Sequence, residues 1–316
     1  MKIAMLGAGA LGCAIGAALT ESGHETWLIA RSPSHVGAMC RDGLQVDDTS
    51  GSRRVRVRAT TQADDVGVAD LVIVLVKSFH TAAAMRGAQG LIGPDTLVLS
   101  LQNGLGHEDS LADVVGRERV LAGKTYVGGV RRGDAHIESG VAGKLTFIGE
   151  LDGRITPRVQ AIADAFNAAG LATTVSDNIV GTMWDKLLVN VATGALTGIT
   201  GLTYGQLYGE PLLKSTSLAA VAEAIGVAQA AGVRLSMTDP EQAWTLAAEG
   251  LPAAFKTSML QSLERGTMTE IDFINGSVVR WGQRYGVPTP VNATLVACIK
   301  GIERAMTDRQ AKEVVA

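Results

Sequence analysis

A glycine-rich turn near the N-terminus restricts the fold of this chain more than any other feature of its sequence. Residues 7–12 read GAGALG and follow a short apolar run, residues 2–6 (KIAML). Small and apolar side chains then recur at helical spacing over residues 9–22, and residues 25–30 (ETWLIA) are apolar and β-prone again. A strand, a tight turn, a helix and a second strand within about 30 residues predict a βαβ unit.

The three glycines of this turn have the spacing G-x-G-x-x-G. In this context Gly7 permits the tight turn, Gly9 lets the backbone approach a pyrophosphate, and Gly12 lets the helix pack closely on the strand. The first helical turn adds N–H groups without helical partners and the positive end of the helix dipole, and both favour a phosphate. The sequence therefore predicts a dinucleotide site that is contacted by Gly7, Gly9, Ala10, Leu11 and Gly12.

The residues after the second predicted strand indicate which dinucleotide binds. An NAD enzyme commonly has Asp or Glu about 20 residues after the glycine turn, where the carboxylate accepts a hydrogen bond from the ribose 2′-hydroxyl. This chain has Arg31 and Ser32 there, a guanidinium and a hydroxyl that suit a 2′-phosphate. We therefore predict NADP as the cofactor. Lys77, which follows the apolar run 71–76, is a further predicted cofactor contact, because open α/β sheets bind ligands at the carboxyl ends of their strands.

Further strand-like segments extend the βαβ unit into a sheet. The continuous apolar runs at 71–76 (LVIVLV) and 96–101 (TLVLSL) predict parallel strands that are buried on both faces, as in a doubly wound sheet. Residues 54–58 alternate basic and apolar side chains and predict one strand at an exposed edge. The β-prone segments between residues 119 and 150, separated by glycines, predict antiparallel strands that complete the same sheet.

The second half of the chain carries helical patterns. Ser176 and Asp177 can each cap a long helix that begins near residue 178. We predict an α/β fold in which an N-terminal Rossmann domain with a doubly wound sheet, residues 1–176, is followed by an all-helical C-terminal domain, residues 177–316. The other predicted helices cover residues 157–169, 210–231, 239–249, 252–265, 269–285 and 290–306.

Composition excludes several classes of protein. The formal net charge of -3, with acidic and basic residues interspersed, predicts no nucleic-acid partner. The 3 cysteines form no C-x-x-C pair and the 5 histidines lack metal-ligand spacing, so we expect no metal site and no disulfide framework. We expect a cytoplasmic protein with no signal peptide or membrane span, and the small-residue helices are compatible with a homodimer. His107 is expected at the surface, without a role.

Further motifs follow the glycine turn in an order and spacing that resemble the ketopantoate reductase family, and the resemblance covers essentially the whole chain. It implies reduction of a 2-keto acid to a 2-hydroxy acid by hydride from NADPH, with ketopantoate to pantoate, a step of pantothenate biosynthesis, as the leading candidate. The motifs that carry the resemblance are Arg31, Lys77-Ser78, Asn103-Gly104, Trp184-Asp185-Lys186-Leu187 with Asn190, and Ser258-Met259 followed by Thr269-Glu270-Ile271-Asp272.

The resemblance also implies roles for individual residues. Lys186 matches a lysine that donates a proton to the substrate carbonyl, and Glu270 matches a glutamate that binds substrate and orients the site. Asn103 and Asn190 match asparagines that contact cofactor and substrate, and Ser258 matches a serine that contacts the substrate carboxylate. Lys77 and Arg31 match cofactor contacts.

The chemistry of these residues supports the same roles. Hydride transfer to a carbonyl carbon leaves negative charge on oxygen, and a positioned ammonium such as that of Lys186 stabilises this charge and supplies the proton. Glu270 can act as its counter-charge. Lys186 and Asn190 are four residues apart, so one helical face presents both.

Two positions depart from the family pattern. Gly194 stands where the family commonly has a second asparagine, and Ser262 stands where it commonly has an aspartate. Loss of a hydrogen-bonding side chain at 194 leaves space and removes a partner for a substrate hydroxyl. A bulkier or less polar 2-keto acid, branched or aromatic, is therefore an equal contender as substrate. Reduction of an imine, and a non-catalytic NADPH-binding sensor whose helical domain meets a protein partner, are the remaining alternatives.

Overall fold

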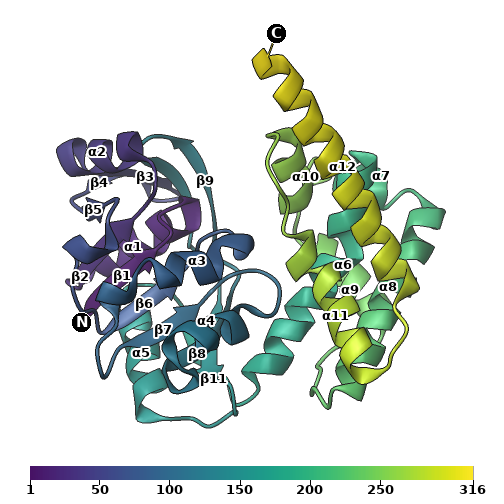
Figure 1. Cartoon of the computed structure of the whole chain (residues 1–316), viewed down its shortest axis with the longest axis horizontal. Coiled ribbons are helices and arrows are strands. Elements are labelled where there is room, and N and C mark those ends of the chain that lie inside the picture. The colour runs from purple at the N-terminus through teal and green to yellow at the C-terminus, as the bar shows by residue number, and fades with distance from the viewer. Residues whose placement is uncertain (316) are drawn as a thin grey trace. The chain divides into compact units, whose positions relative to one another are not determined.

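The computed structural model describes residues 1–315 and consists of two compact units (Figure 1). Residues 1–102 and 107–179 form the first, which we call the Rossmann unit. Residues 103–106, together with the chain from Val180 onward, form the second, which we call the helical unit. Residues 103–106 thus belong to the helical unit, although the chain on both sides of them belongs to the Rossmann unit.

The Rossmann unit is built on an eight-stranded sheet in the order β12-β11-β8-β7-β6-β1-β2-β5. The central strand β1 pairs in parallel with β2 on one side and with β6 on the other, so the strand order reverses beside β1. β11 runs antiparallel to β8, and the other pairs are parallel. This confirms the predicted doubly wound sheet. The strands are β1 (Lys2–Leu6), β2 (Glu25–Ile29), β5 (Arg58–Thr60), β6 (Leu71–Val74), β7 (Leu97–Ser100), β8 (Val120–Thr125), β11 (Thr146–Glu150) and β12 (Thr173–Val175).

Helices cover both faces of this sheet, which explains why its central strands are apolar throughout. Ile3 and Met5 of β1 belong to the core cluster that includes residues of α1, and Ala4 and Leu6 belong to the cluster that includes residues of α3 and α4. Burial on alternate faces therefore fixes the register of the strand. The helices of this unit are α1 (Ala10–Glu21), α2 (Pro33–Asp42), α3 (Thr81–Arg86), α4 (His107–Val115) and α5 (Pro157–Ala168).

A second, four-stranded sheet in the order β4-β3-β10-β9 corrects two sequence-based predictions. Residues 54–58 do not form one strand, because β4 ends at Val55 in the small sheet and β5 begins at Arg58 in the main sheet. The strands of residues 119–150 are likewise divided, because β9 and β10 leave the main sheet and pack with β3 on α1. The strands of the small sheet are β3 (Leu44–Asp48), β4 (Gly51–Val55), β9 (Gly128–Gly133) and β10 (His136–Gly140).

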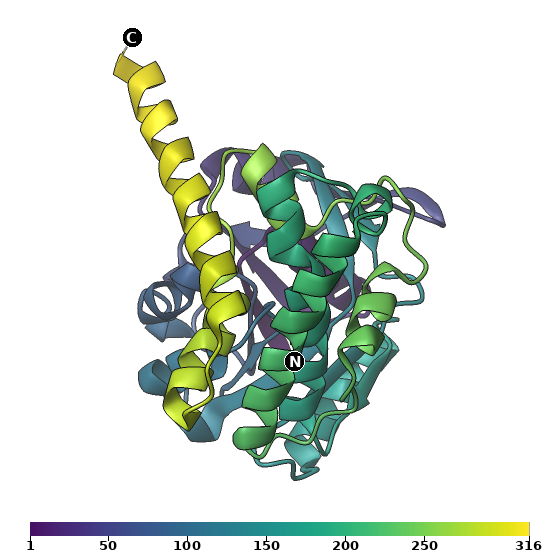
Figure 2. The ribbon, with the colours of Figure 1, turned by 90° about the vertical axis from the view of Figure 1, so that its right-hand side faces the viewer.

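The helical unit contains the green and yellow helices of Figures 1 and 2. Two predicted helices begin later than expected. Thr257 caps α10 by accepting the Leu260 N–H at 3.2 Å, so residues 252–257 are not helical, and the segment predicted as a helix from 269 is a 3-10 turn, Ile271–Phe273, before α11. α7 was not predicted. The helices are α6 (Ile179–Thr200), α7 (Tyr204–Leu207), α8 (Pro211–Ala230), α9 (Pro240–Ala248), α10 (Ser258–Glu264), α11 (Asn275–Tyr285) and α12 (Pro290–Val315).

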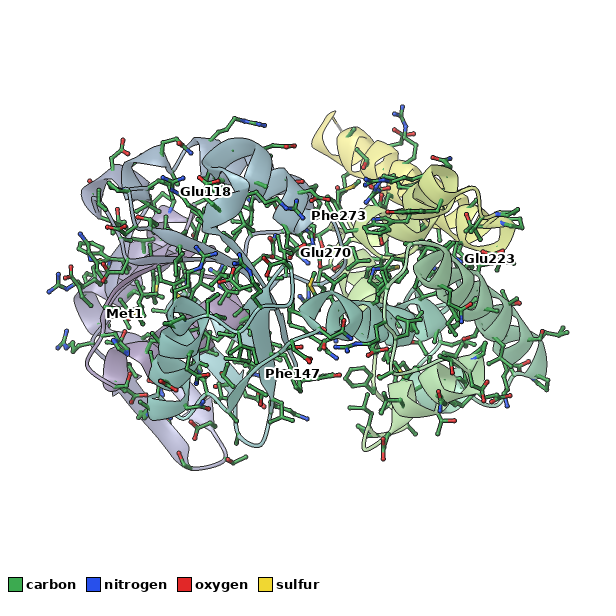
Figure 3. The ribbon with its side chains drawn as sticks, turned by 90° about the horizontal axis from the view of Figure 1, so that it is seen from below. Met1, Glu118, Phe147, Glu223, Glu270 and Phe273 are labelled. Atoms are coloured by element: carbon green, nitrogen blue, oxygen red, sulfur yellow. The ribbon has the colours of Figure 1, made fainter. Side chains whose placement is uncertain are left out.

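Helix α8 is the one helix of the described chain that is long and apolar enough to cross a membrane by length and composition. The same test is passed by core helices of soluble proteins, so it is weak support for a membrane span. Within the helical unit α8 packs against α9, α11 and α12. Glu223 of α8, labelled in Figure 3, accepts the N–H groups of Val291 at 2.8 Å and of Asn292 at 2.9 Å, which caps the start of α12.

Candidate active site

The glycine turn lies where the strand order of the main sheet reverses. Gly7 has φ +117°, and a Cβ there would lie 2.6 Å from the backbone of Leu75 and Val76, just beyond β6. A Cβ on Gly12 would lie 2.1 Å from the Gly7 carbonyl oxygen. Both positions therefore exclude every side chain, and the turn is held tightly between β1, α1 and the end of β6.

The middle glycine is open instead of crowded. Apart from Gly9 and its two neighbours in the chain, no atom of the described residues lies within 4 Å of the position that a Cβ on Gly9 would take. The first hydrogen bond of α1 runs from the Cys13 N–H to the Gly9 carbonyl at 2.8 Å, so the amides of Ala10 and Leu11 precede the helical ladder and can bind another acceptor. Accessible amides at a helix N-terminus fit the pyrophosphate of a dinucleotide.

Basic side chains flank this turn at the carboxyl edge of the sheet. Arg31 follows β2 and is exposed, with Nη1 3.4 Å from Nε2 of His80, which belongs to the turn after β6. Ser32 caps α2, its Oγ accepting the His35 N–H at 3.3 Å. Lys77 is exposed and directly precedes the 3-10 turn Ser78–His80. The end of β2 thus carries a guanidinium beside a helix N-terminus, a combination that can bind an anion.

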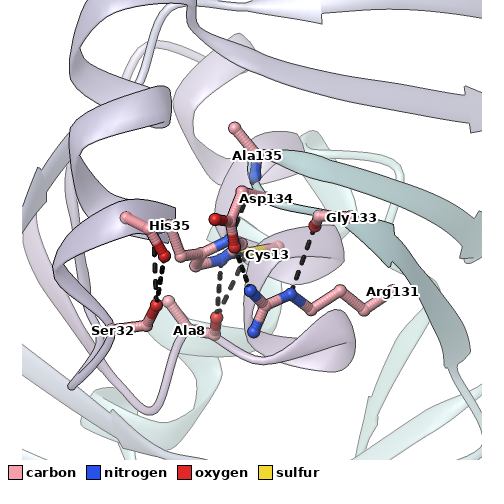
Figure 4. A network of polar contacts seen from close by, with 9 residues as sticks. Ala8, Cys13, Ser32, His35, Arg131, Gly133, Asp134 and Ala135 are labelled. Atoms are coloured by element: carbon pink, nitrogen blue, oxygen red, sulfur yellow. Dashed lines mark hydrogen bonds and ion pairs between the residues drawn. The ribbon is translucent and has the colours of Figure 1, made fainter.

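His35 holds the glycine turn in place through a hydrogen bond to its backbone (Figure 4). Its buried ring accepts the Ala135 N–H on Nδ1 at 3.0 Å, so Nε2 carries the proton and donates to the Ala8 carbonyl at 3.2 Å. Burial, followed by the nearby charge of Arg131, lowers the pKa of His35, which keeps the ring neutral. Sequence reasoning gave His35 no role, because Ala135 is 100 positions away in the chain.

A buried polar network supports the ends of β6 and β7. Gln102 Nε2 donates to the Val76 carbonyl and to Thr81 Oγ1, both at 2.8 Å, which fixes the backbone just before Lys77 and just before Asn103. Glu108 lies beside this network, and burial raises the pKa of its carboxyl to about 7. His107, expected at the surface, is fully buried at the start of α4, so that prediction was wrong.

In the helical unit, the Asn103 segment and the Glu270 segment lie side by side. The Leu105 N–H donates to the Phe273 carbonyl at 3.0 Å. Gly104 has φ +93°, and a Cβ there would come within 2.3 Å of the same carbonyl oxygen, so this contact requires glycine. Glu270 and Phe273, both labelled in Figure 3, belong to one short segment. Two motifs that are more than 160 positions apart are therefore in direct backbone contact.

Helix α12 holds the Glu270 segment in place. Glu303, almost completely buried, accepts hydrogen bonds from the N–H and the Oγ1 of Thr269, both at 2.7 Å. Lys300 of α12 forms ion pairs with Asp272, which follows Glu270, and with Glu303. Its Nζ lies 2.9 Å from Asp272 Oδ2 and 3.0 Å from Glu303 Oε2. The backbone that carries Glu270 is thus fixed on both flanks. The sequence motif did not indicate Glu303 as a support.

Helix α6 presents Lys186 and Asn190 on one partly exposed face. The rotation of the helix is set by Trp184, which is fully buried and packs edge-on against Trp281 at 5.5 Å between ring centroids. Asp185 points elsewhere and accepts the Ser236 N–H at 3.0 Å. In the motif around Lys186, Trp184 therefore packs in the core of the helical unit, whereas Lys186 and Asn190 lie on the partly exposed face.

The remaining predicted positions differ in their surroundings. Gly194 lies in α6, where of the described residues only Met259, with Cε at 3.6 Å, would contact an added Cβ. Ser258 is the exposed first residue of α10, and Ser262 is buried in the same helix. The Rossmann unit thus carries the glycine turn, Arg31 and Lys77, and the helical unit carries the predicted substrate-binding and catalytic residues: Asn103, Lys186, Asn190, Ser258 and Glu270.

Comparison with known proteins identifies the family. Two family models match the chain, Ketopantoate reductase PanE/ApbA over residues 3–153 and Ketopantoate reductase PanE/ApbA C terminal over residues 178–303. The 2-dehydropantoate 2-reductase of Halobacterium salinarum is 34% identical over 305 residues, which cover 96% of this chain and 99% of that protein. This chain belongs to the ketopantoate reductase family.

Members and neighbours of the ketopantoate reductase family share the fold over nearly the whole chain. A PanE/ApbA family ketopantoate reductase from Ralstonia eutropha is 36% identical with a TM-score of 0.89, covering 97% of this chain and 100% of that one. A D-mandelate dehydrogenase, solved with NADH and anilino(oxo)acetate, is 27% identical with a TM-score of 0.89 and covers 97% and 100%. Among the described residues of this reductase-family chain, no group of three or more His, Cys, Asp and Glu side chains could hold a metal ion.

Proposed function

We propose that this protein reduces a 2-keto acid to a 2-hydroxy acid with NADPH, with ketopantoate to pantoate as the leading candidate reaction. The observation that carries the proposal is the match to both family models, which together span the Rossmann unit and the helical unit. The relatives named 2-dehydropantoate 2-reductase, 34% and 32% identical, support the same reaction.

The residues of the Rossmann unit fit NADPH. The amides at the start of α1 would bind the pyrophosphate beside Gly9, and the Arg31 guanidinium would bind the 2′-phosphate. Lys77 would add a further positive charge to the cofactor site. When bound, the nicotinamide ring supplies the hydride. The absence of Asp or Glu from residues 30–32 favours NADPH over NADH, although the D-mandelate dehydrogenase neighbour was solved with NADH.

The helical unit would supply the proton and orient the substrate. The Lys186 ammonium donates a proton to the carbonyl oxygen as negative charge develops there, which contributes about 10²- to 10⁴-fold in rate for a general acid. Glu270 balances the charge of the lysine and accepts a hydrogen bond from a substrate hydroxyl. Asn103 and Asn190 donate and accept hydrogen bonds to the cofactor and the substrate, and Ser258 contacts the substrate carboxylate.

An aromatic or branched 2-keto acid is the second candidate substrate, and one position favours it. Gly194 removes an amide that would bind a polar substrate group, and an added Cβ there has only an ordinary contact with Met259 among the described residues. Gly194 is buried, and the loss of a hydrogen-bonding side chain at this position favours a substrate group that needs no polar partner there. The likeness to a D-mandelate dehydrogenase supports this candidate, because mandelate is the product of reducing an aromatic 2-keto acid.

A substrate panel tests the proposal. Purified protein is mixed with NADPH or NADH and with ketopantoate, branched 2-keto acids and phenylglyoxylate, and kcat/KM is measured from cofactor oxidation. We expect turnover with NADPH and a clear preference for one of these acids. A kcat/KM for ketopantoate far above all others would eliminate the aromatic candidate. Tight NADPH binding without any turnover would refute the reductase proposal and favour a sensor, and turnover only after addition of an amine would favour an imine reductase.

A further inference from the structure

A second lysine of the Rossmann unit lies at the same edge of the sheet as the glycine turn. Lys124 is near the end of β8, and its residue is only 6% exposed. β8 runs parallel to β7, with Ser100 opposite Ala122, so Lys124 lies at the carboxyl edge, beside the strand end that precedes Asn103. No role follows for Lys124 from the glycine motif or from the family's named site residues.

Two aromatic rings lie close to the Lys124 ammonium. Lys124 Nζ lies 4.3 Å from the ring centroid of Tyr126 and 5.8 Å from that of Phe147, which is its cross-strand neighbour on β11 and is labelled in Figure 3. Tyr126 remains 44% exposed, so one side of this group is accessible from solvent. The strand end is rigid, because Thr125 Oγ1 lies 2.8 Å from Thr146 Oγ1 and accepts the Val127 N–H at 3.1 Å.

The order of strands places Lys124 and its two aromatic neighbours near the nicotinamide end of a bound dinucleotide. Along the edge the sequence of strands is β2, β1, β6, β7 and β8. A cofactor that binds with its 2′-phosphate at Arg31 after β2 and its pyrophosphate at the turn after β1 extends its nicotinamide toward β7 and β8. Lys124 is therefore on the nicotinamide side of the Rossmann unit.

The negative charge of the substrate carboxylate would be balanced by a nearby cation. A 2-keto acid carries a full negative charge on its carboxylate, and the residue assigned to it by resemblance, Ser258, is a neutral hydroxyl. Lys186 is assigned to the carbonyl oxygen, and Arg31 and Lys77 are assigned to the cofactor. A lysine shielded by aromatic rings attracts a carboxylate more strongly than a lysine in bulk water.

We propose that Lys124, over the ring of Tyr126 and beside that of Phe147, binds the carboxylate of the 2-keto acid, and that the two rings contact its apolar side chain. This inference rests on the proposed reductase function and deepens it. It makes the three residues a specificity element for carboxylates with aromatic or branched substituents, and it distinguishes acids from their neutral esters.

Binding measurements test this role directly. Calorimetry would compare anilino(oxo)acetate and its neutral methyl ester as ligands of the NADPH complex, for the wild type and for Lys124→Met. We expect the variant to bind the acid about 10- to 100-fold more weakly, with ester binding changed by less than about threefold, because one charge-assisted hydrogen bond is lost. Lys144→Met is the matched control, since Lys144 is exposed in the turn before β11, and it should bind the acid as the wild type does.

The outcomes separate this inference from the proposed function. If Lys124→Met is folded by circular dichroism and binds the acid as tightly as the wild type, the lysine only packs against the rings and the inference is wrong. If Lys124→Met does not fold, Lys124→Gln and the charge-preserving Lys124→Arg replace it, and only Lys124→Arg should retain the preference for acid over ester. A wild type that binds the acid but reduces no 2-keto acid would refute the reductase function without removing the binding site.

Discussion

Arg31 is the residue on which the NADPH assignment depends. Its guanidinium follows β2 beside the capped start of α2, and residues 30–32 themselves carry no carboxylate that would repel a phosphate. Arg31→Ala should weaken NADPH binding by about 10- to 100-fold and NADH binding by less than about threefold, because only NADPH has the 2′-phosphate. Arg41→Ala, at the far end of the same helix, serves as the control. Equal losses for the two cofactors, measured by fluorescence titration, would remove the assignment.

Lys186 should affect the chemical step more than cofactor binding. Its face of α6 is fixed by Trp184 and not by the lysine itself, so truncation leaves the helix in place. Lys186→Ala should lower kcat by about 10²- to 10⁴-fold, with NADPH affinity within about threefold of the wild type. Lys214→Ala removes a lysine that forms a surface ion pair with Glu241 and should leave kcat unchanged. A Lys186→Ala variant with normal kcat would exclude the lysine as proton donor.

Glu108 links stability to pH. Burial raises the pKa of its carboxyl from 4.5 to about 7, so the folded state binds this proton more tightly than the unfolded state. The free energy of unfolding should therefore fall as pH rises from about 4.5 to about 7, by up to about 3 kcal/mol. Glu108→Gln should be more stable than the wild type at pH 8 and similar at pH 4, as measured by urea denaturation. Asp113→Asn, at an exposed position of the same helix, should not reproduce this difference.

At the scale of elements, the long periodic segments were predictable and the pairing of short strands was not. The continuous apolar runs of β6 and β7 can be buried only in the centre of a covered sheet, so the sequence predicted them correctly. Arg54 and Arg58 share one alternating pattern but belong to different sheets, because β4 pairs with β3 and β5 pairs with β2. Which partner a strand takes depends on contacts distant in sequence, and the local pattern carries no signal for it.

The same limit applies to the candidate site. The residue types of Lys186, Asn190 and Glu270 and their spacing could be identified from the sequence. Their supports could not be identified, because Glu303 acts through Thr269 from a helix 34 positions away. His35 acts on the glycine turn through a backbone carbonyl, which has no sequence signature.

The contact between the Asn103 segment and the Glu270 segment can be tested with a matched pair of glycines. Gly104 and Gly106 both have positive φ, but only Gly104 would place a Cβ against the Phe273 carbonyl among the described residues. Each substitution by alanine costs about 1 kcal/mol or more through backbone strain. Gly104→Ala should cost clearly more than Gly106→Ala and should also lower kcat, because the clash displaces the backbone beside Glu270. Equal losses of stability in urea denaturation would show that the contact contributes little.

For the whole molecule, the assignment of the cofactor site to one unit predicts where NADPH protects the backbone from hydrogen exchange. The proposed cofactor contacts before residue 103 all belong to the Rossmann unit. NADPH at about 100 times its Kd stabilises the binding state by about 2.7 kcal/mol, which slows exchange through openings that abolish binding by about 100-fold. Peptides covering residues 7–12 and 30–35 should show this protection by mass spectrometry, whereas peptides from α8 should change much less. Equal protection of α8 would mean that the two units open together, and absence of protection in both regions would place the cofactor elsewhere.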